Sequence, residues 1–169
     1  ISDAIPDVTL TLKSKTVTTP TPEPVTVNVT TDPESVKSNI AALASAYNDI
    51  VKFVNERTTY DISTKTGGIF FNESTAKNVL SQLRTALSGN VAGLFTYTTL
   101  GEVGFKTERD GTVTIDNAKL DTALANNYSA TKALFITQPT SSGIADRVVK
   151  AVDFLAAVDT GAFTIRKTA

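Results

Sequence analysis

"TDPESVKSNIAALASAYNDIVKFVNERT", residues 31–58, carries the clearest structural signal in the chain. A helix start lies at its beginning: the Asp32 carboxylate can accept hydrogen bonds from free backbone N–H groups, and Pro33 suits the first helical position. Glu34 adds a negative charge at the positive end of the helix dipole. The segment therefore predicts one long helix that runs to about Thr58.

Within this segment, apolar side chains recur at alternating steps of four and three residues. They are Val36, Ile40, Leu43, Tyr47, Ile50 and Val54. This spacing is typical of a seam packed against a partner helix, and Val51 and Phe53 widen the apolar surface. Because the stripe covers fewer than three heptads, we favour a long coiled-coil-like helix inside a globular bundle over a free-standing coiled coil.

Shorter helices are predicted further along the chain. We expect Asn72 to cap a second helix, which stops at Gly89 in a left-handed conformation. Asp116 and Ser129 are the expected caps of two more. Apolar residues at helical spacing predict a last helix over 143–158. These helices would supply the partners of the long one.

A β-hairpin is predicted near residues 105–115, "FKTERDGTVTI". Its strands are separated by an Asp-Gly step, and we expect Asp110 and Gly111 to supply the positive φ angles of a tight turn. This hairpin would brace one end of the helical bundle.

The amino-terminal part has a different pattern. "VTLTL" at 8–12 and "VTVNV" at 25–29 alternate apolar and polar residues, as half-buried strands do, and a Thr- and Pro-rich loop at 14–24 joins them. Two strands alone are at best marginally stable, so we interpret residues 1–30 as part of a larger antiparallel β domain. The predicted fold class is therefore α+β: this partial β domain, then a predominantly helical bundle over 31–169.

Composition excludes several classes of function. Sixteen basic and seventeen acidic residues leave a net charge of −1 without a block of one sign, which does not favour nucleic acid or an anionic membrane as partner. The chain has no Cys, His, Met or Trp, so thiol chemistry, imidazole chemistry and nearly all transition-metal sites are excluded. Without Met, and with Ile1 first, it is expected to be a piece of a longer protein.

Acidic residues cluster in "TERDGTVTIDNAKLDTAL", residues 107–124, which raises the possibility of a calcium loop. An EF-hand loop needs Gly at position six and a bidentate Glu at position twelve. Counted from Asp110, those positions hold Ile115 and Asp121, so the spacing excludes this site.

A pair of catalytic carboxylates is also not favoured. It would need one acid with a raised pKa in an apolar cleft, opposite a second carboxylate. Each acid here has a simpler structural role: Asp110 opens the turn, Asp116 caps a helix, and Asp121 lies on the polar side of that helix.

Ser-Lys nucleophiles are the main familiar arrangement left without His. The chain contains two Ser-x-x-Lys matches and one Lys-Thr-Gly match, at Ser74–Lys77, Ser129–Lys132 and Lys65–Gly67. The order is wrong for a penicillin-binding enzyme and the Ser-Asp-Asn element is missing, so we interpret both Ser residues as helix-start residues. We predict no enzyme activity, no catalytic residue, no cofactor-binding residue and no metal ligand.

Several fragments, in order along the chain, resemble the carboxy-terminal half of the bacterial flagellar hook-associated protein 2 family. They are "IPDVTLTL" at 5–12, "VTVNVTTD" at 25–32, "AYNDIV" at 46–51, "SQLRTAL" at 81–87, "LGEVGF" at 100–105, "RDGTVTID" at 109–116 and "KLDTAL" at 119–124. The match covers most of the chain and is weakest after Phe135.

The resemblance implies a structural subunit of the flagellar filament cap, exported to the outside of the cell without a cleaved signal peptide. Such a subunit forms a ring at the filament tip and promotes flagellin polymerisation, so the implied partners are itself, flagellin, a flagellar export chaperone and host surface glycans. Residues 31–169 would form its helical leg domain. The alternative is an adhesin or ligand-binding module that acts through the Thr-rich loop at 14–24 or a loop at 60–69.

Overall fold

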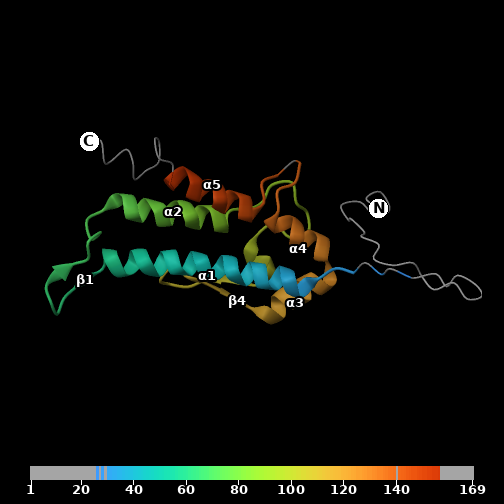
Figure 1. The fold of residues 1–169 in the computed structure, drawn as a ribbon, viewed down its shortest axis with the longest axis horizontal. Coiled ribbons are helices and arrows are strands. Elements are labelled where there is room, and N and C mark those ends of the chain that lie inside the picture. Colours follow the sequence, from blue (N-terminus) through green and yellow to red (C-terminus); the bar gives the residue numbers. More distant parts are fainter. Residues whose placement is uncertain (1–25, 27, 29, 140, 157–169) are drawn as a thin grey trace, which may run out of the picture. The chain divides into compact units, whose positions relative to one another are not determined.

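The computed structural model describes residues 26, 28, 30–139 and 141–156, and the side chains only as far as residue 154 (Figure 1). The chain divides into two compact units, Ile1–Thr31 and Asp32–Ala169. The strand predicted at 8–12, most of that predicted at 25–29 and the 14–24 loop lie outside the described residues. Nearly all of the described residues belong to the second unit.

This unit is predominantly helical with two short antiparallel hairpins, which confirms the predicted α+β class. Its elements are α1 (Pro33–Thr58), β1 (Tyr60–Asp61), β2 (Thr66–Gly67), α2 (Ser74–Ser88), the 3-10 helix η1 (Leu100–Val103), β3 (Phe105–Thr107), β4 (Val113–Ile115), α3 (Asn117–Asn126), α4 (Tyr128–Phe135) and α5 (Ile144–Ala156).

The α2 helix lies between α1 and α5 and runs antiparallel to both (Figure 1). The β3–β4 hairpin packs on α1, while α4 packs on α3 and α5. The long helix therefore contacts α2 and β4 most extensively. We expected the last helix to pack on α1 as well, but its main partners are α2 and α4.

The long helix begins and ends where the sequence predicts. The Asp32 carboxylate accepts a hydrogen bond from the Ser35 N–H at 3.0 Å, and Pro33 is the first helical residue. Of the six stripe residues, three are buried and three are partly buried against the core. The most buried line is displaced to one side, because Ala44 and Val51 are buried where Leu43 and Ile50 are only partly so.

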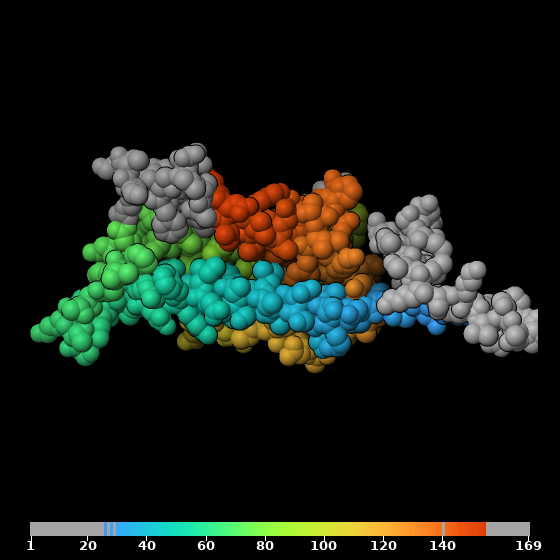
Figure 2. Space-filling model, in the orientation of Figure 1, coloured from blue at the N-terminus to red at the C-terminus, as the bar shows by residue number. Residues whose placement is uncertain are grey.

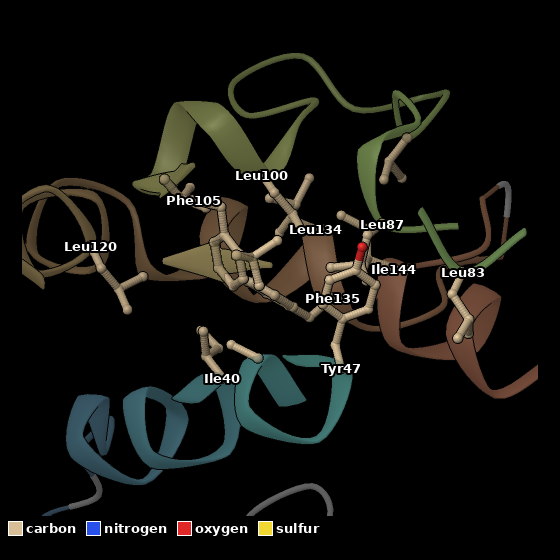
Figure 3. Packing of buried hydrophobic residues seen from close by; sticks show 14 of the residues in the cluster. Ile40, Tyr47, Leu83, Leu87, Leu100, Phe105, Leu120, Leu134, Phe135 and Ile144 are labelled. Carbon is tan, nitrogen blue, oxygen red and sulfur yellow. The ribbon is translucent and has the colours of Figure 1, made fainter. Parts of the chain in front are cut away.

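One apolar core joins the helices to the β3–β4 hairpin (Figure 3). Its largest fully buried side chains are Leu83, Leu120, Leu134, Ile144, Val51, Val91, Val103 and Thr131. The polar member of this set, Thr131, is satisfied locally, since its hydroxyl donates to the Ala123 and Asn127 carbonyls at 3.1 and 3.0 Å. Burial without an unpaired polar atom removes the desolvation penalty at this position.

Three of the expected helix ends are wrong. The second helix has Glu73 rather than Asn72 at its N-cap. Asn127 caps α4, since its side chain accepts from the Ala130 N–H at 2.9 Å, and Ser129 lies inside the helix. Gly89 does follow the end of α2, but with φ −71° and ψ 143°, which is extended and not left-handed.

Residues 60–69 are not the open loop that the sequence suggests. Tyr60 pairs with Gly67 and Asp61 with Thr66 in the β1–β2 hairpin, and Lys65 takes a positive φ of 53°. Non-Gly residues seldom adopt this conformation, so neither the turn nor two-residue strands leave a clear sequence signal.

The β3–β4 hairpin is present, but its turn differs from the prediction. Gly111 has a positive φ of 89° and Asp110 does not. The Glu108 N–H donates to the Thr112 carbonyl at 2.8 Å, and the Gly111 N–H donates to the Glu108 carbonyl at 3.0 Å. This is a three-residue loop with one left-handed residue rather than a two-residue turn.

Candidate assembly surfaces

The β3–β4 hairpin is attached to α1 by the Asn48 side chain. Its amide donates to the Val113 carbonyl at 2.8 Å, and its Oδ1 accepts from the Val113 N–H at 2.7 Å. Both backbone groups on the open side of β4 at this position are thereby satisfied. One side chain of the helix thus acts as a neighbouring strand would.

Two more α1 side chains bind the turn of the same hairpin. The buried Tyr47 hydroxyl donates to the Gly111 carbonyl at 3.0 Å, and the Asn55 amide donates to the Asp110 carbonyl at 2.8 Å. Gly111 has a positive φ of 89°, which disfavours a side chain there, and a Cβ would lie 2.6 Å from an Arg84 guanidinium nitrogen of α2. The hairpin is therefore held along α1, near Arg84 of α2, and not at one end of the bundle.

The α5 helix is docked by Arg147. Its guanidinium donates to the Gly89 carbonyl at 2.9 and 3.2 Å and to the Asn90 carbonyl at 3.1 Å, just past the end of α2. A cation suits this place, since carbonyls at a helix C-terminus lack helical partners and carry partial negative charge. The contact sets the start of α5 beside the end of α2, which no local sequence pattern predicts.

A group of exposed apolar side chains lies around β1–β2; we call it the hairpin end. Its members are Phe53, Tyr60, Ile62, Ile69 and Phe71. Ile62 is 82% exposed, Ile69 77% and Phe53 48%, so Phe53 widens the apolar surface of α1 without being buried in the core. The Phe53 ring instead contacts the Arg57 guanidinium, 3.7 Å from the ring centroid, and lies near the Phe70 ring.

A second exposed apolar group lies on α5; we call it the outer face of α5. Val149 and Val152, three residues apart, form it and are 57% and 40% exposed, whereas Phe154, 56% exposed, lies on another side of the helix. Exposed apolar side chains that gather on one surface commonly mark a contact with another molecule. The hairpin end and this face are the two candidate assembly surfaces.

Two cavities open elsewhere on the unit. One of about 350 Å³ has a largely apolar lining that includes Val36, Ile40, Leu43, Phe135 and Ile136. Another of about 250 Å³ lies between Tyr47, Arg84 and the β3–β4 hairpin. The first lacks the convergent polar groups that a small-ligand site needs.

The acidic residues weighed as candidate sites have structural partners. The Asp110 carboxylate accepts from the Thr112 hydroxyl and N–H at 2.7 and 2.9 Å, and these bonds lower its pKa. Asp116 caps α3 by accepting from the Lys119 N–H at 3.0 Å. Asp121 forms an ion pair with Lys37 of α1 at 2.7 Å, a partner that sequence reasoning missed.

The Ser and Lys matches are not assembled into one site. Ser74 begins α2 and Ser129 lies in the first turn of α4, both exposed. Lys77 and Lys132 are exposed, and Lys65 is at the β1–β2 turn. Within the part of the chain that the structure describes, no three acidic side chains cluster as metal ligands, and no helix has the length and apolarity to cross a membrane.

A family model described as "Flagellar hook-associated protein 2 C-terminus" matches residues 1–169. Among curated relatives, the polar flagellar hook-associated protein 2 of Vibrio parahaemolyticus is 30% identical over 168 residues, 99% of this chain and 24% of its own length. The Helicobacter pylori protein is 29% identical over 135 residues, 80% of this chain and 19% of its own. The chain thus spans about a fifth to a quarter of these relatives.

The fold has also been seen in a solved structure. The D1-D2-D3 domains of the flagellar cap protein FliD from Escherichia coli match with a TM-score of 0.73 over 92% of this chain and 45% of that one. The two sequences are 22% identical there, so the likeness concerns the fold.

Proposed function

The chain belongs to the flagellar hook-associated protein 2 C-terminus family, and from this we propose that it is part of a structural subunit of the bacterial flagellar filament cap. The subunit assembles with copies of itself at the filament tip, outside the cell, and promotes polymerisation of flagellin there. It is exported without a cleaved signal peptide. Its role is mechanical rather than catalytic.

The observation that carries this proposal is the family match over residues 1–169. The structure supports a mechanical role, because α1, α2 and the β3–β4 hairpin are joined by one apolar core and by the side chains of Tyr47 and Asn48. Interiors packed in this way are stiff and transmit strain. We assign residues 31–169 to a helical leg domain and residues 1–30 to strands of a larger β domain.

Self-assembly can be tested by the mass in solution of the full-length protein and of this chain alone. A ring that forms from the full-length protein supports the proposal. A mass for this chain that stays monomeric would assign the main assembly contacts to the rest of the subunit. A full-length protein that remains monomeric at all accessible concentrations contradicts self-assembly.

The proposed role in flagellin polymerisation can be tested by a functional assay. In a strain that lacks its own cap protein, the full-length gene should restore filament growth and swimming. Matched expression of a variant that cannot fold, such as one with Leu83→Asp in the core, is the control. Secreted but unpolymerised flagellin in the presence of a folded, exported cap protein would contradict the proposed role.

The alternative is ligand binding by exposed loops, and one observation favours it: at the hairpin end the Tyr60 and Phe71 rings lie 5.3 Å apart and are partly exposed. Aromatic faces of this kind can stack on sugars. Binding of host surface glycans by this chain, lost when residues 61–66 are replaced by a short turn, would support it. Pull-down of a dedicated export chaperone by the full-length protein would test the remaining proposed partner.

A further inference from the structure

We propose that the cavity of about 250 Å³ beside Arg84 is a binding site for an acidic segment of a partner protein. In this site the Arg84 guanidinium and the Thr107 hydroxyl bind a carboxylate, and an apolar side chain next to that carboxylate fills the cavity. The choice of a protein as the ligand rests on the proposed function, because a structural subunit acts through other protein chains. The carboxylate chemistry follows from the cavity itself.

A helix face and a strand face form the walls of the cavity. Arg84, Leu87 and Ser88 lie on one face of α2, since they are three and four residues apart. Phe105 and Thr107 lie on one face of β3, since they are two residues apart. Phe105 is buried in the core and Thr107 is exposed. The cavity therefore lies at the border between the core and the solvent.

The floor of the cavity is apolar. Tyr47, Leu87, Leu100 and Phe105 reach it from four different elements, which are α1, α2, η1 and β3 (Figure 3). All four are buried, as is Val113 of β4 beside them. A cavity of about 250 Å³ has room for a large side chain as well as for water. An apolar group of a ligand would therefore be removed from solvent here.

Two hydrogen-bond donors at the cavity have no partner. Neither the Arg84 guanidinium nor the Thr107 hydroxyl forms a hydrogen bond or an ion pair with another described residue. The other hydroxyls that line the cavity already donate to protein oxygens at 2.8–3.3 Å; they are those of Tyr47, Ser88 and Thr99. The free groups are thus donors, and a carboxylate is an acceptor.

The charge of Arg84 is not neutralised within the part of the chain that the structure describes. None of the residues that line the cavity is acidic. The acids that are close to them in sequence are bound by other groups; they are Glu102, Glu108 and Asp110. An anionic ligand is therefore favoured, and a guanidinium can bind a carboxylate through two parallel N–H···O bonds.

The Arg84 guanidinium is held against the β3–β4 turn. A Cβ on Gly111 would lie 2.6 Å from one of its nitrogens, so the guanidinium takes the space of a side chain at position 111. A cation held in this way loses less conformational freedom on binding than a free side chain does. An exposed ion pair alone still contributes little to affinity. Burial of an apolar group on the floor has to supply the rest, so the ligand needs both parts.

The site is separate from the hairpin end. The β1–β2 hairpin projects past the helices of this unit (Figure 2), and none of the described residues 60–67 lines the cavity. Variants at the two places therefore test different contacts.

A small peptide can test the site in the full-length protein, dissociated into single subunits. The probe is N-acetyl-leucyl-aspartyl amide, and the methyl resonances of Leu87 and Leu100 report its binding. We expect these resonances to shift until the site is saturated. Acetate, which lacks the apolar part, and the asparagine counterpart of the probe, which lacks the charge, should each bind about tenfold more weakly.

Variants identify the groups that bind the probe. Arg84→Gln should weaken binding by about tenfold and Thr107→Val by about threefold. Arg84→Lys keeps the charge without the planar guanidinium, so its affinity should fall between those of Arg84→Gln and the parent. Arg109→Gln is the matched control, because Arg109 is exposed on the β3–β4 loop and does not line the cavity. It should bind the probe as the parent does, and all four variants should keep the parent's unfolding midpoint.

The source of the acidic segment is found by repeating the titration on assembled protein, without and with flagellin. Loss of probe binding on assembly would support the proposal and identify another copy as the partner. Loss that requires flagellin would support it and identify flagellin. A cavity that stays open to the probe in both assemblies would overturn the proposal.

Other failures are equally distinguishable. Equal binding of the aspartyl and asparaginyl probes, equal binding of acetate, or unchanged binding by Arg84→Gln would overturn the site and leave the proposed cap function standing. Methyl resonances that never respond in the dissociated subunit would also overturn it, because another part of the same subunit then covers the cavity. A full-length protein that never assembles would instead overturn the proposed function.

Discussion

The β3–β4 and β1–β2 hairpins are both short antiparallel pairs, yet they have opposite surroundings. Phe105 and Val113 of the first are buried, and α1 binds its open edge and its turn. All four strand residues of the second are exposed. Similar local structure is thus used in one place inside the core and in the other as a projecting surface.

This difference separates residues that stabilise the fold from residues that can contact other molecules. Changes around β3–β4 should lower the stability of the whole unit, because buried apolar area and buried hydrogen bonds are lost together. Changes around β1–β2 should leave the fold intact and alter what the surface binds. Substitutions in the two hairpins test this separation. Their expected effects range from a loss of several kcal/mol in the free energy of unfolding to the titration of one carboxylate.

The largest effect is expected for Tyr47→Ala. It removes a buried ring and the hydrogen bond to Gly111, and should lower the free energy of unfolding by about 3–5 kcal/mol. Tyr47→Phe, which loses only the hydroxyl, should cost about 1 kcal/mol. Ile62→Ala on the other hairpin should stay within about 0.5 kcal/mol of the parent. Urea unfolding of the three variants measures this; equal midpoints for Tyr47→Ala and Ile62→Ala would contradict the comparison.

A smaller loss is expected for Asn48→Ala. The change leaves the N–H and carbonyl of Val113 without their side-chain partner and should cost about 1–3 kcal/mol. Asn55→Ala is the matched control, since Asn55 makes a single exposed bond to the same hairpin, and it should cost less than about 1 kcal/mol. Urea unfolding should show a larger loss of stability for Asn48→Ala than for Asn55→Ala. The reverse order would mean that other groups form hydrogen bonds with the N–H and carbonyl of Val113.

Sequence reasoning worked where the cause is local. The bounds of α1 follow from its cap, its Pro and its apolar spacing, and α3 begins after Asp116 as expected. The predicted cap of α4 was wrong because Asn127 and Ser129, two positions apart, are both residue types that favour the N-cap position. The apolar spacing does not distinguish between them.

Long-range contacts could not be predicted from the sequence. Asn48 and Val113 are 65 positions apart, and Arg147 and Gly89 are 58 apart. Their meeting depends on how the helices pack, as does the displacement of the buried line of α1 toward Ala44 and Val51. The hairpin end was missed for a related reason: Ile62 and Ile69 look like core residues by type, and only the packing leaves them in solvent.

Paired glycine substitutions should separate the two hairpins more finely. Gly111→Ala places a Cβ against Arg84 at a positive φ, and should reduce global stability by about 1–3 kcal/mol. Gly68→Ala pushes β2 away from α1 and should mainly increase hydrogen exchange of the Phe70 amide, whose acceptor is Arg57. An equal global loss for both variants would show that β1–β2 folds as part of the core.

The smallest expected effect is a loss of stability of the β1–β2 turn at low pH. Hydrogen bonds from the Ser63 hydroxyl and N–H to the Asp61 carboxylate lower its pKa from 3.8 to about 2. Because the folded pKa is depressed, the contribution of Asp61 to the β1–β2 turn is present above about pH 3.8 and is lost as the pH falls through about 2. The carboxyl carbon chemical shift should titrate near 2. A midpoint at the ordinary value would show that the turn is open in solution.

Hydrogen–deuterium exchange of the full-length protein, dissociated and assembled, tests the separation of stability from contact most directly. We expect slow exchange at Val51 and Val113 in both states, and an increase in protection on assembly at residues 60–71. Fast exchange along α1 and β4 in the dissociated protein, or no change at the hairpin end on assembly, would contradict the account.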